Sequence, residues 1–201
     1  AIIVSALFLL LNYTYPAFIN WFCKEDSLAE TSSALMYFIA AILFLYLNKK
    51  EGFKNIWYWG YFLLFFVVAG EEISWGQRIF GITTPENLAA VNVQKETNFH
   101  NLDGIHQMIR AFALLIILGI CYAIPFTDRF INFFNNLYKK IKMPVFQIEL
   151  IIIPTIAILF MAIPRLFLNG TLFNWDEFGE WYLSIGFFLF PLILLKSREN
   201  V

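Results

Sequence analysis

Residues 56–78 read IWYWGYFLLFFVVAGEEISWGQR, and this stretch decides the fold class of the chain. Its first part, from Ile56 to Gly70, consists of apolar, aromatic or small residues. As a helix rising 1.5 Å per residue, that part covers roughly 22 Å of the ~30 Å hydrocarbon layer of a bilayer. We therefore expect residues 56–73 to form a transmembrane helix that carries two adjacent acids, Glu71 and Glu72, near its end.

Further apolar runs of this kind fill most of the chain. Of its 201 residues, 60% are hydrophobic and only 14% are charged, whereas a soluble domain carries roughly 25% charged residues. The predicted fold is therefore all-α, a single polytopic transmembrane domain over residues 1–201 with about six spans. The expected spans are approximately 2–22, 31–47, 56–73, 108–126, 145–163 and 181–195.

Basic residues predict the orientation of these spans. Nine of the fourteen lysines and arginines fall in residues 49–54, 129–142 and 196–198, which six alternating spans place on one side. The positive-inside rule makes that side cytoplasmic, together with both termini. Residues 83–107 are then an extracytoplasmic loop, expected to fold over the mouth of the bundle. Residues 127–142 mix basic and aromatic side chains, which is typical of an amphipathic helix in the inner headgroup plane.

Composition and charge also limit the partners. The net charge of −1 argues against a nucleic-acid partner. Membrane lipids are the expected partners, with other membrane subunits as a further option, and the expected location is the plasma (inner) membrane. The first apolar run is too long for a signal peptide and lacks a cleavage signature, and we expect residues to precede Ala1. Cys23 and Cys121 are expected at different depths, so no disulfide is predicted.

Most carboxylates on the outer side are interpreted as helix caps. The second, fourth and sixth spans run inward, so their N-termini face outward, where the helix dipole favours a negative charge by ~0.3–1 kcal/mol. Acids and a serine that precede these spans would cap them and remain solvated. The residues interpreted in this way are Asp26, Ser27, Asp103, Asp176, Glu177 and Glu180.

Glu71 and Glu72 do not fit this interpretation. They lie near the C-terminal end of their helix, where the dipole opposes a negative charge, and burial in lipid costs a few kcal/mol unless the acid is paired, protonated or bound to a cation. At helical spacing Glu71 and Arg78 share a face, while Glu72 points about 100° away. Arg78 is the predicted partner of Glu71, and Arg110 or His106 the predicted partner of Glu72. The alternative is a buried structural ion-pair network.

The outer loop adds histidines to these acids. Polar residues are dense between Asn92 and His106. Before them, Thr84 and Pro85 predict a helix start, with Thr84 as the cap and Pro85 at the first helical position, and a short helix is expected to continue through Val91. Carboxylate and imidazole together suit zinc or a similar divalent cation. The predicted metal ligands are Glu72, His100 and His106, supported by Glu71 and Glu96. The alternative is a hydrogen-bonded lid with solvated histidines.

The run Gly70–Gly81, with its adjacent glutamates followed by Arg78, resembles the first motif of the CAAX-protease and bacteriocin-processing membrane proteins. The resemblance implies that Glu71 or Glu72 activates a water molecule and that Arg78 supports it. Histidines from later in the chain complete the site in that family, and here His100 and His106 would take that part.

Three functions follow from these patterns. The first is a membrane-embedded hydrolase or transferase that acts on a lipid-linked or membrane-adjacent substrate, with Glu71 or Glu72 as base or metal ligand and with Arg78 and Arg110 stabilising negative charge. The second is a non-enzymatic subunit of a membrane complex. The third is a transporter or channel component in which the two glutamates carry protons or cations.

Overall fold

A computed structural model describes residues 1–24, 27–77, 79–167 and 173–199, and within them the chain is helical without a β-strand. Three short turns interrupt the longer helices: η1 (Ser74–Gly76), η2 (Gly119–Ala123), which is a π-helical turn, and η3 (Ile148–Leu150). The helices are α1 (Ile2–Thr14), α2 (Pro16–Cys23), α3 (Leu28–Lys50), α4 (Ile56–Glu72), α5 (Glu86–Ala89), α6 (His106–Leu118), α7 (Ile124–Phe130), α8 (Asn132–Lys140), α9 (Ile152–Phe167) and α10 (Phe173–Glu199).

Three stretches of helix are long and apolar enough to cross a membrane, which confirms the all-α, membrane-type character of the chain. They are Leu28–Lys50, His106–Phe130 and Asn174–Arg198. A fourth span results if α1 and α2 are taken together, although their axes are bent by 118°. The helix over Ile148–Ile163 is apolar but shorter, and α4 has 17 residues.

Proline explains where the first expected span breaks. The sequence predicts one helix over residues 2–22, but the structure ends α1 at Thr14 and starts α2 at Pro16. Proline has no N–H to donate and disfavours helical backbone in the residue before it. Tyr15 accordingly leaves the helix, with φ −136° and ψ 60°. The helix after Gly119 accommodates Pro125 differently, through the π-helical turn η2.

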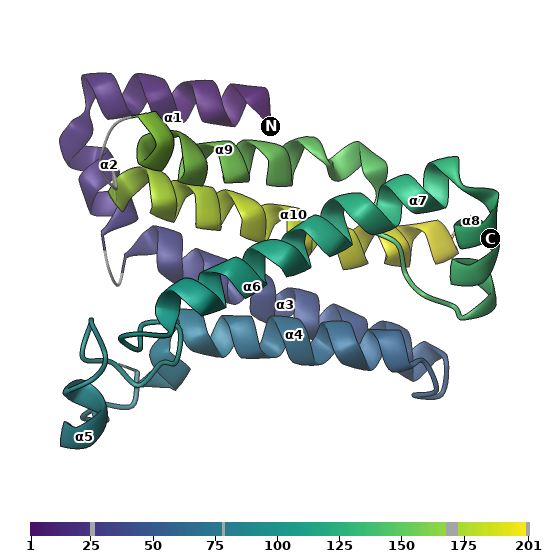
Figure 1. Ribbon diagram of the computed structural model, residues 1–201, viewed down its shortest axis with the longest axis horizontal. Coiled ribbons are helices and arrows are strands. Elements are labelled where there is room, and N and C mark those ends of the chain that lie inside the picture. The colour runs from purple at the N-terminus through teal and green to yellow at the C-terminus, as the bar shows by residue number, and fades with distance from the viewer. Residues whose placement is uncertain (25–26, 78, 168–172, 200–201) are drawn as a thin grey trace.

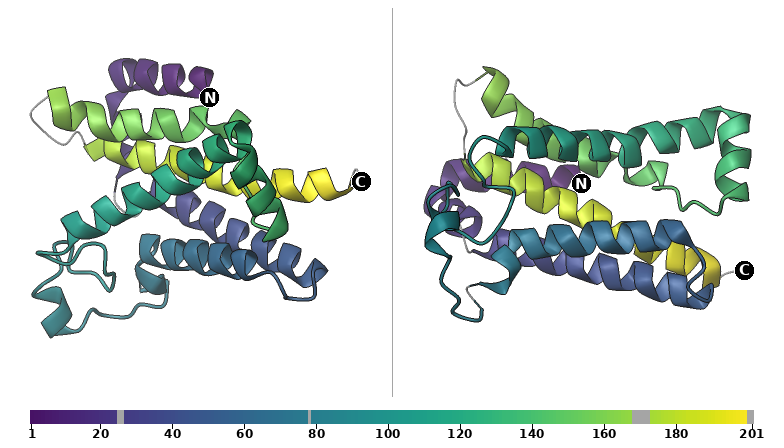
Figure 2. Two further views of the ribbon diagram at one scale, coloured as in Figure 1. Left: turned by 45° about the vertical axis from the view of Figure 1, so that its right-hand side comes forward. Right: turned by 60° about the horizontal axis from the view of Figure 1, so that its bottom comes forward.

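The helices form an elongated bundle with two distinct ends (Figure 1). α3 packs against α4 and α10, and α10 also packs against α9. α6 crosses this group obliquely, and α5 with its flanking loops lies at the opposite end from α8 and the C-terminus (Figures 1 and 2). The N-terminus lies part-way along the bundle, because α1 is only 13 residues long.

Aromatic side chains fill the core where α3, α4 and α10 meet. The Phe44 ring is fully buried and stacks on Tyr61 at 4.8 Å between centroids, with Phe190 edge-on at 5.2 Å. Phe65 and Phe187 continue this group towards the outer end, at 5.1 Å from each other. Large rings of this kind bury much apolar area and prefer these tilted geometries, so they fix the spacing of the three helices.

Two predicted helices have different bounds in the structure. The amphipathic segment 127–142 is divided between α7 and α8, because Ile131 takes extended backbone with φ −125° and ψ 103°. A hydrogen bond from Asn135 Nδ2 to Asp128 Oδ1, 3.0 Å, links the two helices across this corner. The short helix expected from Pro85 to Val91 is α5, which begins at Glu86 with Pro85 as its N-cap residue and ends at Ala89.

Cap predictions also need correction. Ser27 occupies the N-cap position of α3, but its hydroxyl donates to the carbonyl oxygen of Phe22 instead of accepting a helix N–H. Asp103 accepts from the N–H of Gly104, and the N-cap residue of α6 is Ile105. Asp26 lies outside the described residues.

An ion pair holds the C-terminal ends of α3 and α10 together. Arg198 Nη2 donates to Glu51 Oε1 at 2.6 Å and to the Tyr58 hydroxyl at 2.6 Å, and Asn55 Nδ2 donates to Glu51 Oε2 at 3.1 Å. Partial burial disfavours the charged form of Glu51, but the hydrogen bonds from Arg198 and Asn55 and the positive charges of Arg198 and Lys142 outweigh it. The pKa of Glu51 is therefore lowered from its ordinary value.

This lowered pKa predicts an acid-sensitive contribution to stability. A carboxyl whose pKa falls on folding stabilises the folded state above its unfolded pKa, and that stabilisation is lost as the pH drops through the folded value. Because both partners are partly exposed, we expect Glu51→Gln to cost about 1 kcal/mol or less at pH 7. Unfolding in mixed micelles should show this difference shrinking towards zero below pH 4. A difference that stays constant with pH would contradict the assignment.

Candidate functional site

The site begins where α4 ends. Ser74, Trp75 and Gly76 all adopt positive φ, at 47°, 55° and 78°. L-residues rarely occupy this left-handed region, and such positions are held only by surrounding contacts. The turn reverses the chain immediately after Glu71 and Glu72. As a result, the outer loop folds back against the end of α4.

Gly70 and Trp75 fit together in this turn. A side chain at position 70 would meet the Trp75 ring, since a Cβ atom there would lie 2.8 Å from Cε3 and from Cζ3. The absence of a side chain at Gly70 lets the indole lie against α4. From there Trp75 Nε1 donates to Glu71 Oε1 at 2.6 Å.

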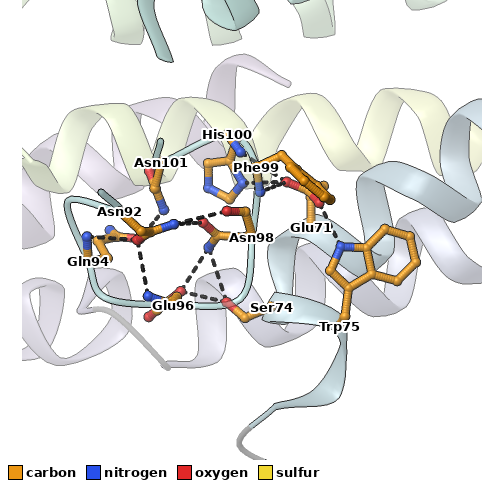
Figure 3. Close-up of polar contacts among 10 residues, drawn as sticks. All are labelled: Glu71, Ser74, Trp75, Asn92, Gln94, Glu96, Asn98, Phe99, His100 and Asn101. Carbon is orange, nitrogen blue, oxygen red and sulfur yellow. Dashed lines mark hydrogen bonds and ion pairs between the residues drawn. The ribbon is translucent and has the colours of Figure 1, made fainter. Parts of the chain in front are cut away.

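Glu71 anchors the outer loop through its second oxygen. Oε2 accepts from the N–H of Phe99 at 2.7 Å and of His100 at 3.0 Å. The same oxygen lies 3.3 Å from His100 Nδ1 (Figure 3). The Glu71 side chain is 14% exposed and that of His100 is 42% exposed. Glu71 and His100 therefore come together, with the imidazole partly exposed.

A second polar group fastens the loop to the η1 turn. Ser74 Oγ donates to Glu96 Oε2 at 2.5 Å, and Asn98 Nδ2 donates to both Ser74 Oγ, at 3.1 Å, and Glu96 Oε2, at 2.9 Å. All three side chains belong to buried residues, at 1%, 8% and 2% exposure for Ser74, Glu96 and Asn98. We call these three residues the latch. Buried and mutually satisfied polar groups of this kind rigidify a structure.

Asn92 gives the loop its shape beside the latch (Figure 3). Its Oδ1 accepts from the N–H groups of Gln94 and Glu96, both at 3.0 Å, and its Nδ2 donates to Asn98 Oδ1 at 2.9 Å. The backbone of Asn92 also forms an isolated antiparallel bridge with Leu102. An asparagine that bonds to nearby backbone favours turns over helix, so residues 92–102 form a compact loop.

A small cavity adjoins the Glu71 anchor. Its volume is about 250 Å³, and it is lined by Trp75, Leu88, Thr97, Asn98 and Phe99. Trp75 and Phe99 also donate to Glu71. An apolar chain or ring could therefore lie close to the Glu71–His100 pair.

The other predicted site residues are not gathered here. His106 Nε2 lies 3.0 Å from Gln107 Nε2, and its buried Nδ1 has no hydrogen-bond partner. In the described part of the chain no hydrogen bond or ion pair joins Arg110, which is exposed, to Glu71 or Glu72. Arg78 lies outside the described residues. Among described residues, no three His, Cys, Asp or Glu side chains are grouped so that they could hold a metal ion, so Glu72, His100 and His106 are not assembled as a ligand set.

Glu72 has different neighbours from those expected. It interacts electrostatically with Glu180, Glu30 and Glu71, and Glu177 interacts with the same group. α3, α4 and α10 therefore bring carboxylates close together at the end of the bundle where α4 ends. Asp176 lies in the first turn of α10 but is buried, at 8% exposure, so the prediction of a solvated cap is wrong for this residue. The cap interpretation also misses that Glu177 and Glu180 lie near Glu72.

Sequence reasoning missed the donors that hold Glu71. Trp75 lies four residues after Glu71, a spacing that suggests contact, but the contact is made from a turn and not from a continuous helix. Two other donors are the backbone N–H groups of Phe99 and His100, which a pattern of side chains cannot predict. Ser74 and Asn98 are 24 residues apart, and only the density of polar residues in the loop indicated such a network.

The fold and the site define a helical, membrane-type protein with a polar loop folded onto one end of its bundle. A scan against protein-family models found no match to this chain, and searches of curated proteins and of solved structures found none either.

The latch generates a stability prediction. Ser74→Ala removes a donor to the buried Glu96 carboxylate and an acceptor for Asn98, so we expect the loop to be destabilised by about 1–3 kcal/mol. Amide hydrogen exchange within residues 92–102 should accelerate while exchange in α3 and α10 stays slow. Ser197→Ala is the control, because Ser197 is exposed and donates only to the Leu194 carbonyl oxygen at 2.9 Å. Equal exchange in the two variants would show that the latch does not hold the loop.

Proposed function

We propose that this chain is an integral membrane hydrolase whose Glu71–His100 pair acts as an acid–base dyad on a lipid-linked or membrane-adjacent substrate. The observation that carries the proposal is the 3.3 Å contact between His100 Nδ1 and Glu71 Oε2, with the imidazole 42% exposed. A carboxylate at Nδ1 favours the tautomer that keeps a proton there, which leaves Nε2 free to accept one.

The contacts of Glu71 favour His100 as the base. The resemblance to glutamate-dependent membrane proteases implies a glutamate that activates water. Here, however, Glu71 already accepts from Trp75, from two backbone N–H groups and from His100. A carboxylate satisfied in this way is a weak base. Glu71 therefore orients His100, as the acid does in a catalytic triad.

The chemistry needs only water and a reactive carbonyl or phosphoryl group. His100 Nε2 takes a proton from water as the water oxygen bonds to the substrate centre, and the imidazolium then returns this proton to the leaving group. Arg78, taken from the sequence motif, is the group proposed to stabilise the negative charge that develops. No step is assigned to a metal, because the described donors do not form a ligand group.

Exposed apolar side chains around the loop support a substrate in or near the membrane. Ile79, Phe80, Val93, Phe99 and Met108 are each more than 60% exposed. Such residues beside a polar site suit the boundary between headgroups and acyl chains. The apolar part of a lipid-linked substrate would then lie against this rim and in the cavity of about 250 Å³ beside the dyad.

The topology proposed with this function has six spans and both termini in the cytoplasm. α1 with α2, α3, α4, the α6–α7 stretch, α9 and α10 supply the spans. Lys49, Lys50 and the basic residues of α8 lie at the end opposite to the dyad. The positive-inside rule then places the dyad on the extracytoplasmic side of the plasma (inner) membrane.

A second candidate, a non-enzymatic subunit of a membrane complex, rests on α6. Only 11% of the apolar window in His106–Phe130 is buried, and none of the residues of α6 is buried. A span so little covered by its own chain offers its surface to lipid or to a partner helix.

Orientation can be tested by thiol labelling. Cys23 and Cys121 are both 0% exposed, so they should give little background. We expect a membrane-impermeant maleimide added to intact cells to label Asn87→Cys, in exposed α5, but not Asn136→Cys, in exposed α8. The reverse pattern would invert the topology, and labelling of both positions would contradict the two-ended arrangement.

The dyad predicts a kinetic and a spectroscopic result. In proteoliposomes made with total lipid from the source membrane, Glu71→Gln and His100→Gln should each slow release of a hydrolysis product, measured by mass spectrometry, by about 10²–10⁴-fold. His106→Gln is the matched control and should retain activity.

The spectroscopic measurement of the dyad needs no substrate. The chain has two histidines, so ¹⁵N spectra of the imidazoles resolve into His100 and His106. We expect His100 to carry its neutral proton on Nδ1 in the wild type and to lose that preference in Glu71→Gln. An Nε2–H tautomer at His100 in the wild type would contradict the proposed dyad. A correct tautomer without any hydrolysis product would favour the subunit function instead.

A further inference from the structure

A larger cavity lies at the end of the bundle opposite to the dyad. Its volume is about 530 Å³. It opens between the C-terminal ends of α3 and α10, the first turn of α4, the α7–α8 corner and the segment 142–145 that follows α8. Several elements converge on it, so its walls belong to the folded bundle and not to a single surface helix.

The lining carries more positive than negative charge available to a ligand. Three cationic side chains, Lys139, Lys142 and Arg198, face two carboxylates, Glu51 and Asp128. Arg198 is paired with Glu51 at 2.6 Å, and Asp128 accepts from Asn135. Within the described ranges neither Lys139 nor Lys142 makes an ion pair, although the charge of Lys142 also acts on Glu51. Both ammonium groups can therefore still contact an anion.

The remaining lining residues are both polar and apolar. Tyr138, whose hydroxyl lies 2.9 Å from Thr127 Oγ1, lines the cavity together with Pro144, Val145 and Leu194. Phe130 and Phe133, at the α7–α8 corner, are 69% and 67% exposed. Exposed rings next to basic side chains are typical of segments that lie in the headgroup plane.

We propose that this cavity binds the phosphate headgroup of an anionic glycerophospholipid. Lys139 and Lys142 contact the phosphate, and the wall of Pro144, Val145 and Leu194 receives the start of an acyl chain. The proposal is independent of the dyad and concerns the opposite end of the protein.

The charges also specify which lipid fits. The zwitterionic headgroup of phosphatidylcholine brings a quaternary ammonium group, and the two carboxylates of the lining are already engaged by Arg198 and Asn135. An anionic headgroup brings no such cation and gains from both lysines. Basic pockets between transmembrane helices on the cytoplasmic side bind lipid headgroups in this way.

Binding can be measured on the full chain after delipidation in a neutral detergent. Three probes are titrated and followed by tryptophan fluorescence and thermal midpoint: dioctanoyl phosphatidylglycerol, dioctanoyl phosphatidylcholine and inorganic phosphate. The test variant is K139Q/K142Q. The matched control is K49Q/K140Q, which removes two exposed lysines from the same end of the bundle that do not line the cavity.

We expect saturable binding of phosphatidylglycerol that is at least tenfold tighter than that of phosphatidylcholine. K139Q/K142Q should weaken it roughly 25-fold, because each basic side chain beside an anionic lipid contributes roughly a fivefold factor. K49Q/K140Q should bind as the wild type does. Both double variants replace exposed side chains, and unchanged thermal midpoints without lipid would show that they are folded.

Three outcomes would overturn the proposal. Equal affinity for the two lipids would remove the charge selectivity, and an equal loss in both double variants would indicate diffuse attraction to the basic surface. Inorganic phosphate that binds as tightly as phosphatidylglycerol would make the ligand a soluble phosphate compound instead of a lipid.

Discussion

One carboxylate, that of Glu71, holds the loop of residues 92–102 onto the end of α4. Glu71 stands at the last turn of α4 and accepts hydrogen bonds from the Trp75 indole, from two successive loop N–H groups and from His100. A negative charge near the C-terminal end of a helix is unfavourable by itself, and these donors compensate it. The same contacts bring residues 99–100 down onto α4. The same hydrogen bonds therefore compensate the charge of Glu71 and place the loop.

The latch makes the anchor rigid. Ser74, Glu96 and Asn98 are buried within the turn and loop that flank Glu71, and they hold the turn in its left-handed backbone conformation. Around them the exposed side chains are mostly apolar, as a membrane surface requires. At the opposite end, Arg198 of α10 donates to Glu51 at the end of α3 and to Tyr58 of α4. Glu71 at one end and Glu51 at the other are thus carboxylates that each accept several hydrogen bonds and join neighbouring segments.

The sequence predicted the parts of this structure that depend on periodicity and composition. It predicted helices throughout, apolar runs of membrane length and a short helix close to Glu86. It did not predict the break at Pro16, because the apolar run continues across it, nor the corner at Ile131. The grouping of Glu72 with Glu30, Glu177 and Glu180 depends on how α3, α4 and α10 pack, and spacing along the chain carries no information about that packing. The donors to Glu71 are partly backbone, which side-chain patterns cannot reveal.

The contact between Gly70 and Trp75 limits how this chain can vary over evolution. Any side chain at position 70 would displace the indole and with it one of the donors to Glu71. A replacement of Gly70 is thus tolerated only together with a smaller residue at position 75, and a second polar group must then take over the bond to Oε1. The two positions should change as a pair in diverging sequences, and a glycine at 70 with a tryptophan at 75 should mark the members that keep the anchored loop.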